Sequence, residues 1–202
     1  LRGGINIATI TEFQQETGVS LDPTSVIGLN FALYTDLNIS EHFGIQPEIN
    51  YLQKGAEMSG ADENEGEFRF KMRVNYLEVP VLAKLRFGAE KLRGFAMVGP
   101  SVGYALGGEG TVSIDGVEVT EKIEFDNDLD DDGYKDQRWD VGAVIGAGAA
   151  LSAGPGNVIL DLRYGLDFTD FAKYQSVPAD HEKSYNRGFG ISLGYQIPIN
   201  KK

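Results

Sequence analysis

The sequence contains no cysteine and only two histidines among its 202 residues. The absence of cysteine excludes disulfide bonds and thiol chemistry, although it does not identify a compartment. No window of about 18 apolar residues occurs, so we expect no transmembrane helix. No charged and apolar leader opens the chain, so an envelope protein with this sequence would have its signal peptide removed or left out. The net charge of −12 argues against a nucleic-acid partner.

Catalytic signatures are also missing. No phosphate-binding loop, dinucleotide turn or HExxH motif is present. His42 and His181 fall in expected connections, and neither has a serine and a carboxylate in a recognisable catalytic order. Ser176 and Asp180 lie near His181, but an ordinary polar loop explains them better. The sequence therefore predicts a protein that is not an enzyme and has no cofactor, with calcium as the one open exception considered below.

What the sequence has is alternation, and Tyr76 to Phe87 shows it most clearly. Every second residue of this stretch is apolar, and the residues between them include Glu78, Lys84 and Arg86. A period of two residues indicates a β-strand with one apolar and one polar face. Its length is close to the roughly 9–11 residues of a tilted strand that crosses a bilayer.

Seven further segments carry the same period, which gives eight expected strands. Their ranges are 3–9, 26–38, 43–56, 71–87, 94–107, 138–151, 158–168 and 185–199. In the fifth, Phe95 and Met97 begin an apolar face, and Val102, Tyr104 and Leu106 continue it in the opposite phase. One inserted residue would cause this, so we expect a β-bulge at Gly99 and Pro100.

Prolines 47, 80 and 100 are unexpected in central strands, because proline has no N–H group to donate to the hydrogen-bond ladder of a sheet. We expect each of them at a local bulge, at a similar depth on three neighbouring strands.

The connections alternate between long and short along the chain. Residues 10–25, 57–70, 108–137 and 169–184 form long connections, whereas 39–42, 88–93 and 152–157 form short ones. An up-and-down meander places all long loops at one end, as in outer-membrane barrels with short periplasmic turns and long extracellular loops. We therefore predict a single domain, residues 1–202, that is all-β: an eight-stranded antiparallel up-and-down transmembrane β-barrel.

Two barrels fit this pattern, and they differ in which face is outside. A soluble, lipocalin-like barrel would bury the apolar face and expose the charges. The polar face is rich in glycine, and an eight-stranded barrel has an interior just wide enough for side chains, so the inverted arrangement fits better. It predicts that the following residues face lipid: Leu77, Val79, Val81, Leu85, Phe87, Leu160, Leu162, Ile191 and Leu193.

In the inverted barrel, the charged residues of the strands become a buried lumen network. Buried charges persist only when they are paired. The expected members are Glu48, Lys54, Glu78, Lys84, Arg86, Asp161 and Arg163. Such a network either fills a closed plug or lines a gated pore or proton path, and the plug is favoured because eight strands leave no open channel.

Several runs resemble a known family. They are IQPEINYLQKGA (45–56), NYLEVPVLAKLRF (75–87), FAMVGPSVGYALGG (95–108), DLRYGLDF (161–168) and NRGFGISLGYQI (186–197). These runs resemble the PorT-like outer-membrane β-barrel domain of Bacteroidetes-type bacteria. The resemblance implies a barrel in the bacterial outer membrane, in contact with lipid and lipopolysaccharide. It implies little about activity, although the name-giving member belongs to a secretion and gliding apparatus.

The loop at 108–137 is strongly acidic, with eleven Asp or Glu residues against two lysines. Within it, residues 128–133 match the start of a calcium loop, D-x-D-x-D-G. The expected ligands are Asp128, Asp130, Asp132, Asp136 and the carbonyl of Tyr134. Trp139 stands where the bidentate acid should be, so a calcium site and a solvated acidic loop both remain open.

These features predict a non-enzymatic outer-membrane barrel with a closed lumen, acting as a structural or accessory subunit of an envelope complex for secretion, gliding or assembly. The alternative is a surface binding or adhesion module that uses the acidic loop. A narrow pore and a lipid-modifying enzyme are further alternatives. The expected partners are outer-membrane lipid, lipopolysaccharide and other envelope proteins.

Overall fold

The computed structural model describes residues 1–11, 23–62, 66–89, 91–114, 116–123, 125, 134–170, 172–174 and 183–198. No helix within these ranges is long and apolar enough to cross a membrane. The strands are β1 (Arg2–Ile10), β2 (Thr24–Tyr34), β3 (Leu37–Asn38), β4 (Phe43–Asp62), β5 (Gly66–Ala89), β6 (Leu92–Ile114), β7 (Val117–Ile123), β8 (Tyr134–Asp136), β9 (Trp139–Ala153), β10 (Gly156–Asp167), β11 (Ala172–Tyr174) and β12 (Asn186–Gln196).

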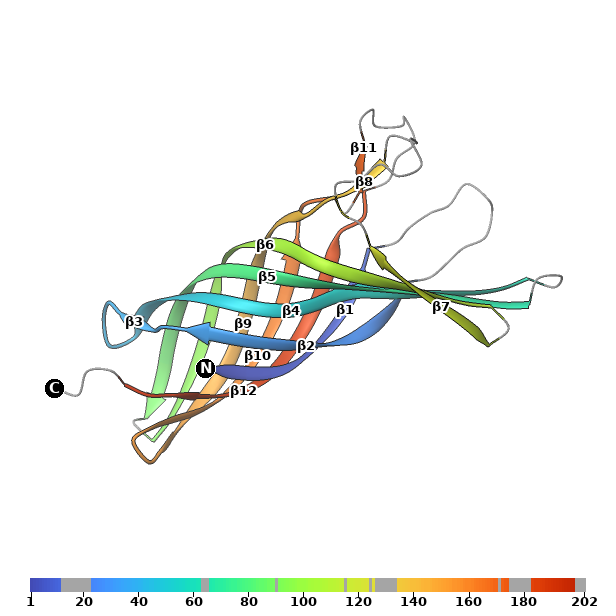
Figure 1. The fold of residues 1–202 in the computed structure, drawn as a ribbon. Helices are drawn as coiled ribbons and strands as arrows, with labels where there is room; N and C mark the ends of the chain where they lie inside the picture. Colours follow the sequence, from blue (N-terminus) through green and yellow to red (C-terminus); the bar gives the residue numbers. More distant parts are fainter. Residues whose placement is uncertain are drawn as a thin grey trace.

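The long strands form a closed antiparallel barrel. The sheet runs in the order β2-β1-β12-β10-β9-β6-β5-β4, and a further pairing between β2 and β4 closes it. The short β3 pairs with β4, and β7 pairs, among the described strands, with β6 alone, outside the barrel. The predicted fold class, an eight-stranded antiparallel barrel, is confirmed. Figure 1 shows the beginning of β1 and the end of β12 at the end of the barrel that carries the short turns.

Side chains alternate between the two faces of the barrel wall. In β2, Val26, Gly28, Asn30 and Ala32 are buried, and every residue between them is exposed. The wall turns its large apolar side chains outward and its polar and small ones inward, opposite to a soluble barrel. The soluble alternative is therefore wrong.

Two expected long connections, 57–70 and 108–137, are largely strand where the structure describes them, and 169–184 contains the short β11. Residues 57–62 of β4 pair with residues 66–71 of β5, well beyond the barrel. Likewise, β6 continues to Ile114 and turns back as β7, so that the four strands form one extended sheet, which we call the outer sheet (Figure 1). The sequence pattern missed these segments because their apolar residues lie on the inner face, opposite to those of the barrel wall.

The predicted bulge at Gly99 and Pro100 is wrong. The register between β6 and β9 runs without a shift from Leu92 to Tyr104. Phe95 and Met97 instead point inward, where they form a buried cluster with Leu82, Val144 and Ile159. The apparent change of phase therefore came from two apolar side chains inside the lumen. The register does shift farther along, where Asn75 pairs with Gly107 but Tyr76 pairs with Ala105.

The three prolines lie at one level, as predicted, but not at bulges. Pro47 pairs with Val81, next to Pro80, and Pro80 pairs with Ser101, next to Pro100. No register shift occurs at any of these positions. Clustering the missing donors at one level of β4, β5 and β6 confines the loss of ladder hydrogen bonds to a single site in the wall.

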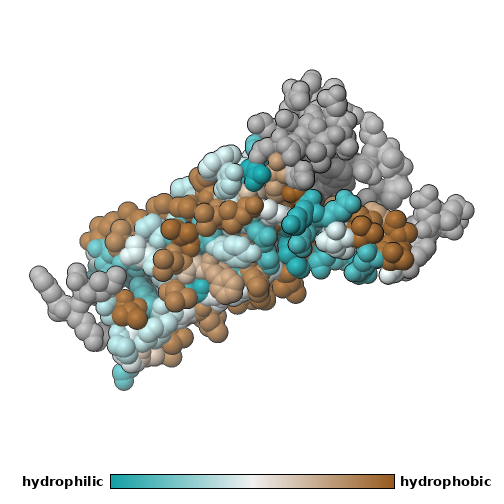
Figure 2. Space-filling model, in the orientation of Figure 1, coloured by the Kyte–Doolittle hydropathy of each residue, from teal (hydrophilic) through white to brown (hydrophobic). Residues whose placement is uncertain are grey.

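The polarity of the wall reverses above the barrel. On the inner face of the outer sheet, Phe68 pairs with Ile114 and Ile114 with Val117 across three strands. The opposite face carries charged residues such as Glu57, Arg69 and Lys71. Figure 2 shows hydrophobic residues along the barrel, a hydrophilic group where the outer sheet begins and a second hydrophobic patch farther toward its tip. This change marks the level at which the strands leave an apolar environment.

Candidate functional site

The lumen is the site where functional side chains gather, and glycines make room for them. A Cβ on Gly142 would lie 2.5 Å from the Asp167 carboxylate, and one on Gly148 would lie 2.4 Å from the Phe95 ring. These glycines belong to β9, whose inner face is otherwise occupied by Asp140, Val144 and Ala150. Large charged side chains from the opposite strands can therefore fill the centre of the barrel.

The central group joins two arginines to two carboxylates. Glu48 accepts hydrogen bonds from Arg163 Nη1 at 2.7 Å, Arg163 Nη2 at 2.8 Å and Arg2 Nη2 at 2.8 Å. Asp161 accepts from Arg163 Nε at 2.6 Å, and it lies 3.7 Å from Arg2 Nη1. All four residues are buried. The group is electrically neutral, so each buried charge has the partner that it needs.

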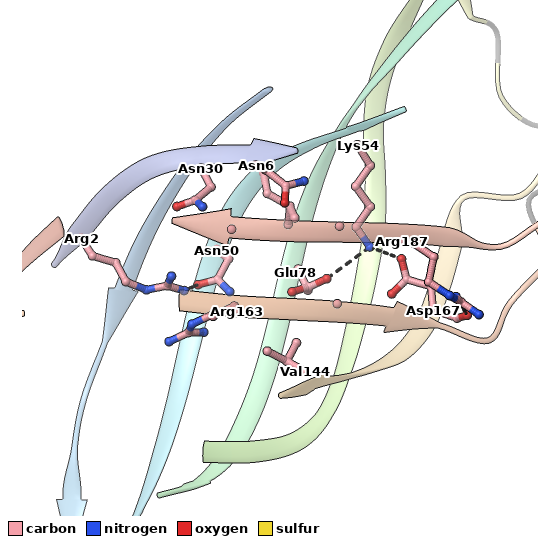
Figure 3. A pocket seen from close by; sticks show the side chains of 14 residues that line it. Arg2, Asn6, Asn30, Asn50, Lys54, Glu78, Val144, Arg163, Asp167 and Arg187 are labelled. Atoms are coloured by element: carbon pink, nitrogen blue, oxygen red, sulfur yellow. Dashed lines mark hydrogen bonds and ion pairs between the residues drawn. The ribbon is translucent and has the colours of Figure 1, made fainter. Parts of the chain in front are cut away.

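The second group, toward the outer sheet, surrounds one lysine with three carboxylates. Lys54 Nζ lies 2.6 Å from Asp167, 3.2 Å from Asp140 and 3.3 Å from Glu78. Figure 3 shows Lys54 reaching toward Glu78, which comes from the neighbouring β5, and toward Asp167, which comes from β10. Asn186 donates to Asp140 at 3.1 Å, and the Tyr76 ring lies 4.8 Å from the ammonium. This group carries more negative than positive charge.

The third group lies at the short-turn end and has the opposite balance. Asp36 forms ion pairs with Lys84 at 3.0 Å and with Arg86. Lys84 also donates to Gln46 at 2.7 Å, and Gln46 donates to Glu48. Gln46 thereby connects the third group to the central one. The three groups follow one another along the barrel axis, and we call them together the polar column.

The column leaves little free space in the middle of the barrel. A cavity of about 60 Å³ lies between the central and second groups, lined by residues that include Arg2, Lys54 and Arg163 (Figure 3). Such a volume admits a few water molecules at most. Paired charges in a filled interior hold the walls together.

The structure places every expected member of the lumen network inside the barrel. Glu48, Asp161 and Arg163 meet in the central group, Lys54 and Glu78 in the second, and Lys84 and Arg86 in the third. The network has four further members: Arg2, Asp36, Asp140 and Asp167. Alternation already places Asp36, Asp140 and Asp167 on the polar faces of the expected strands, and it missed only Arg2, which precedes the first expected strand. Arg2 shares the inner face of β1 with Asn6.

The nine residues expected to face lipid all lie on the outer wall. Their exposed fractions range from 37% for Ile191 to 62% for Leu193. The nine are Leu77, Val79, Val81, Leu85, Phe87, Leu160, Leu162, Ile191 and Leu193.

The expected calcium ligands lie outside what the structure describes. Asp128, Asp130 and Asp132 fall in an undescribed range, and only the backbone of Tyr134 and Asp136 is described, as part of β8. Ser176, Asp180 and His181 also fall outside. Among the described residues, no group of three acidic, histidine or cysteine side chains could hold a metal ion. His42 lies exposed in the turn before β4.

A closed barrel with an apolar exterior and a charged, filled interior defines the class of membrane-spanning β-barrels. The chain belongs to the outer membrane protein beta-barrel domain family, whose profile matches residues 1–173. This family implies the bacterial outer membrane as its location. A search of curated proteins found no match.

Solved outer-membrane barrels are similar over most of their length. Neisserial surface protein A shares 11% identity, with 95% of this chain and 92% of that chain covered and a TM-score of 0.44. Ail, the attachment invasion locus protein of Yersinia pestis, shares 14% identity, with 96% and 94% covered and a TM-score of 0.39. OprG from Pseudomonas aeruginosa shares 11% identity, with 96% and 91% covered and a TM-score of 0.47.

Proposed function

We propose that this protein is a non-enzymatic anchor that holds a protein-binding sheet at the outer surface of the membrane. In this role it serves as an accessory subunit of an envelope complex for secretion, gliding or assembly, in keeping with its PorT-like sequence runs. The barrel supplies the anchor, and its filled lumen supplies rigidity. The outer sheet supplies the contact with the partner.

The observation that carries this proposal is the free edge of the outer sheet. Strand β7 pairs with β6 on one side and with no described strand on the other. Its inward side chains, Val117 and Val119, are 68% and 55% exposed. An unpaired strand with exposed apolar side chains is a ready template for an added strand from another protein. We therefore assign the partner an extended segment that pairs with β7.

The test is co-purification from the native membrane in mild detergent. Val117→Lys with Val119→Lys should abolish recovery of the partner, because two ammonium groups would enter the apolar face. Thr120→Lys is the matched control, since Thr120 lies exposed on the other face of β7 and binding should persist. Equal recovery of the partner with both variants would contradict the proposal.

A surface binding or adhesion module is the second candidate, and the same projecting sheet supports it. The two candidates differ in where the partner resides. A subunit co-purifies from its own membrane, whereas an adhesion module binds only components added from outside. Calcium bound by the acidic loop would belong to this second candidate, and calorimetry with calcium tests it.

Lipid and lipopolysaccharide are the proposed surroundings of the barrel. The nine apolar residues of the outer wall support contact with acyl chains. Above them, Arg69 and Lys71 face outward on β5, with side chains 61% and 40% exposed. Exposed cations at this level suit the phosphates of lipopolysaccharide.

A further inference from the structure

The short-turn end of the barrel contains a large open cavity that the proposed function does not use. Its volume is about 1350 Å³, and it extends from the third lumen group to the ends of β2, β6 and β12. Small-molecule sites in proteins typically measure about 300–1,000 Å³. The cavity is thus spacious enough for a small organic ligand, unlike the filled centre of the lumen.

The charge of this cavity is opposite to that of the whole chain. Among its lining residues, Lys84, Arg86 and Arg93 are cationic and Asp36 is the one acidic side chain, so three positive charges face one negative charge. The chain as a whole has a net charge of −12. A local excess of two positive charges in so acidic a protein favours an anionic ligand.

Two of the cations lie on neighbouring strands and share one face. Arg86 pairs with Phe95 across β5 and β6, and Arg93 precedes Phe95 by two residues. Diagonal neighbours of this kind lie about 7–8 Å apart. The Arg93 side chain has no ion pair or hydrogen bond within the described part of the chain. Its guanidinium is therefore free to bind a ligand.

Two further donors of the cavity lining lack partners. Arg86 Nη1 and the Tyr34 hydroxyl are buried without a hydrogen bond to any described group. Leaving a buried donor unpaired is costly, and native structures rarely do so without a reason. An anion with several acceptor oxygens would satisfy both donors and neutralise the excess charge.

We propose that this cavity binds a phosphate group, either as the free ion or on a small phosphate ester. A phosphate dianion matches the excess of two positive charges, and the guanidinium forks of Arg86 and Arg93 suit its oxygens. Leu33 and Phe95, which also line the cavity, would contact the organic part of an ester. The site opens at the end that faces the periplasm, remote from the outer sheet, and so does not depend on the proposed partner.

The test is calorimetric titration of the folded chain in an uncharged detergent, with inorganic phosphate and with glycerol 3-phosphate. Equal affinity for the two probes would show that the site recognises the phosphate group alone. Tighter binding of the ester would show that the apolar lining also contributes to binding. Arg93→Gln should weaken binding about tenfold, and Tyr34→Phe about fivefold.

Both variants spare the ion pairs of Asp36, so their folding should persist, and heat-modifiable migration on a gel checks it. Lys91→Gln is the matched control, because Lys91 is exposed in the turn before β6 and does not line the cavity. It removes the same charge and should leave the affinity unchanged. The proposal is overturned if neither probe binds, or if all three variants bind as the wild type does.

Discussion

At the residue scale, Glu48 is the centre of the lumen. It accepts hydrogen bonds from both arginines of the central group and from Gln46, which in turn contacts Lys84. The glutamate is fully enclosed, with no exposed side-chain area. Its contribution to stability therefore comes from holding two guanidinium groups that would otherwise be buried without a counter-charge.

Replacing this residue by glutamine should destabilise the barrel strongly. Glu48→Gln leaves Arg2 and Arg163 with Asp161 as their one remaining carboxylate, and breaking a buried ion pair costs about 3–5 kcal/mol. The measurement is the free energy of unfolding by urea in lipid vesicles. Glu57→Gln is the matched control. The ion pairs of Glu57 with Arg69 and Lys71 are partly exposed, so their loss should lower the free energy of unfolding by less than about 1 kcal/mol. Equal losses in the two variants would refute the role assigned to Glu48.

At the element scale, β5 has two parts with opposite polarity. Below the register shift at Asn75 it presents Leu77, Val79 and Val81 outward. Above the shift, the outward positions are Arg69, Lys71 and Arg73, and the apolar residues point inward. Where a strand passes from lipid into water, its outward face must change from apolar to polar. In β5 this change takes place within a few residues.

This boundary predicts how an inserted charge is tolerated. Val79→Arg should cost about 2–4 kcal/mol of folding stability in a bilayer, as for a charge at the midplane on the lipid face of a barrel. Val119→Arg, in β7, should change the stability by less than about 0.5 kcal/mol, because the side chain is already exposed to water. Unfolding in vesicles measures both. If Val119→Arg proves as costly as Val79→Arg, the outer sheet lies in the membrane and the assigned boundary is wrong.

The same two-part strand explains what alternation could and could not predict. The period of two predicted the barrel strands and which face of each strand is apolar. It succeeded because the outward face is apolar throughout the part of the barrel that crosses the membrane. It missed the outer sheet, where the apolar side chains change face. It also misassigned Phe95 and Met97, because an alternating pattern cannot distinguish an apolar residue that packs in the lumen from one that faces lipid. The ion-pair partners depend on strand register, so Glu48 and Glu78 could be placed inside but not assigned to separate groups.

At the scale of the whole molecule, charge is divided along the barrel axis. The second lumen group has three carboxylates around Lys54, the central group is balanced, and the third has two cations around Asp36. Within each group, the ion pairs are direct. A path for ions would have to separate these pairs in a low-dielectric interior, where separation is costly.

The barrel should therefore not conduct. A cavity of about 60 Å³ at its centre is lined by side chains that form the ion pairs. In planar bilayers we expect no steady ionic current from the purified chain under conditions in which a porin conducts. Reproducible unitary steps whose ion selectivity changes in Lys54→Met would show instead that the column opens. In that case the three groups would be parts of a gate, because current through this lumen requires Lys54 to separate from at least one of its carboxylates.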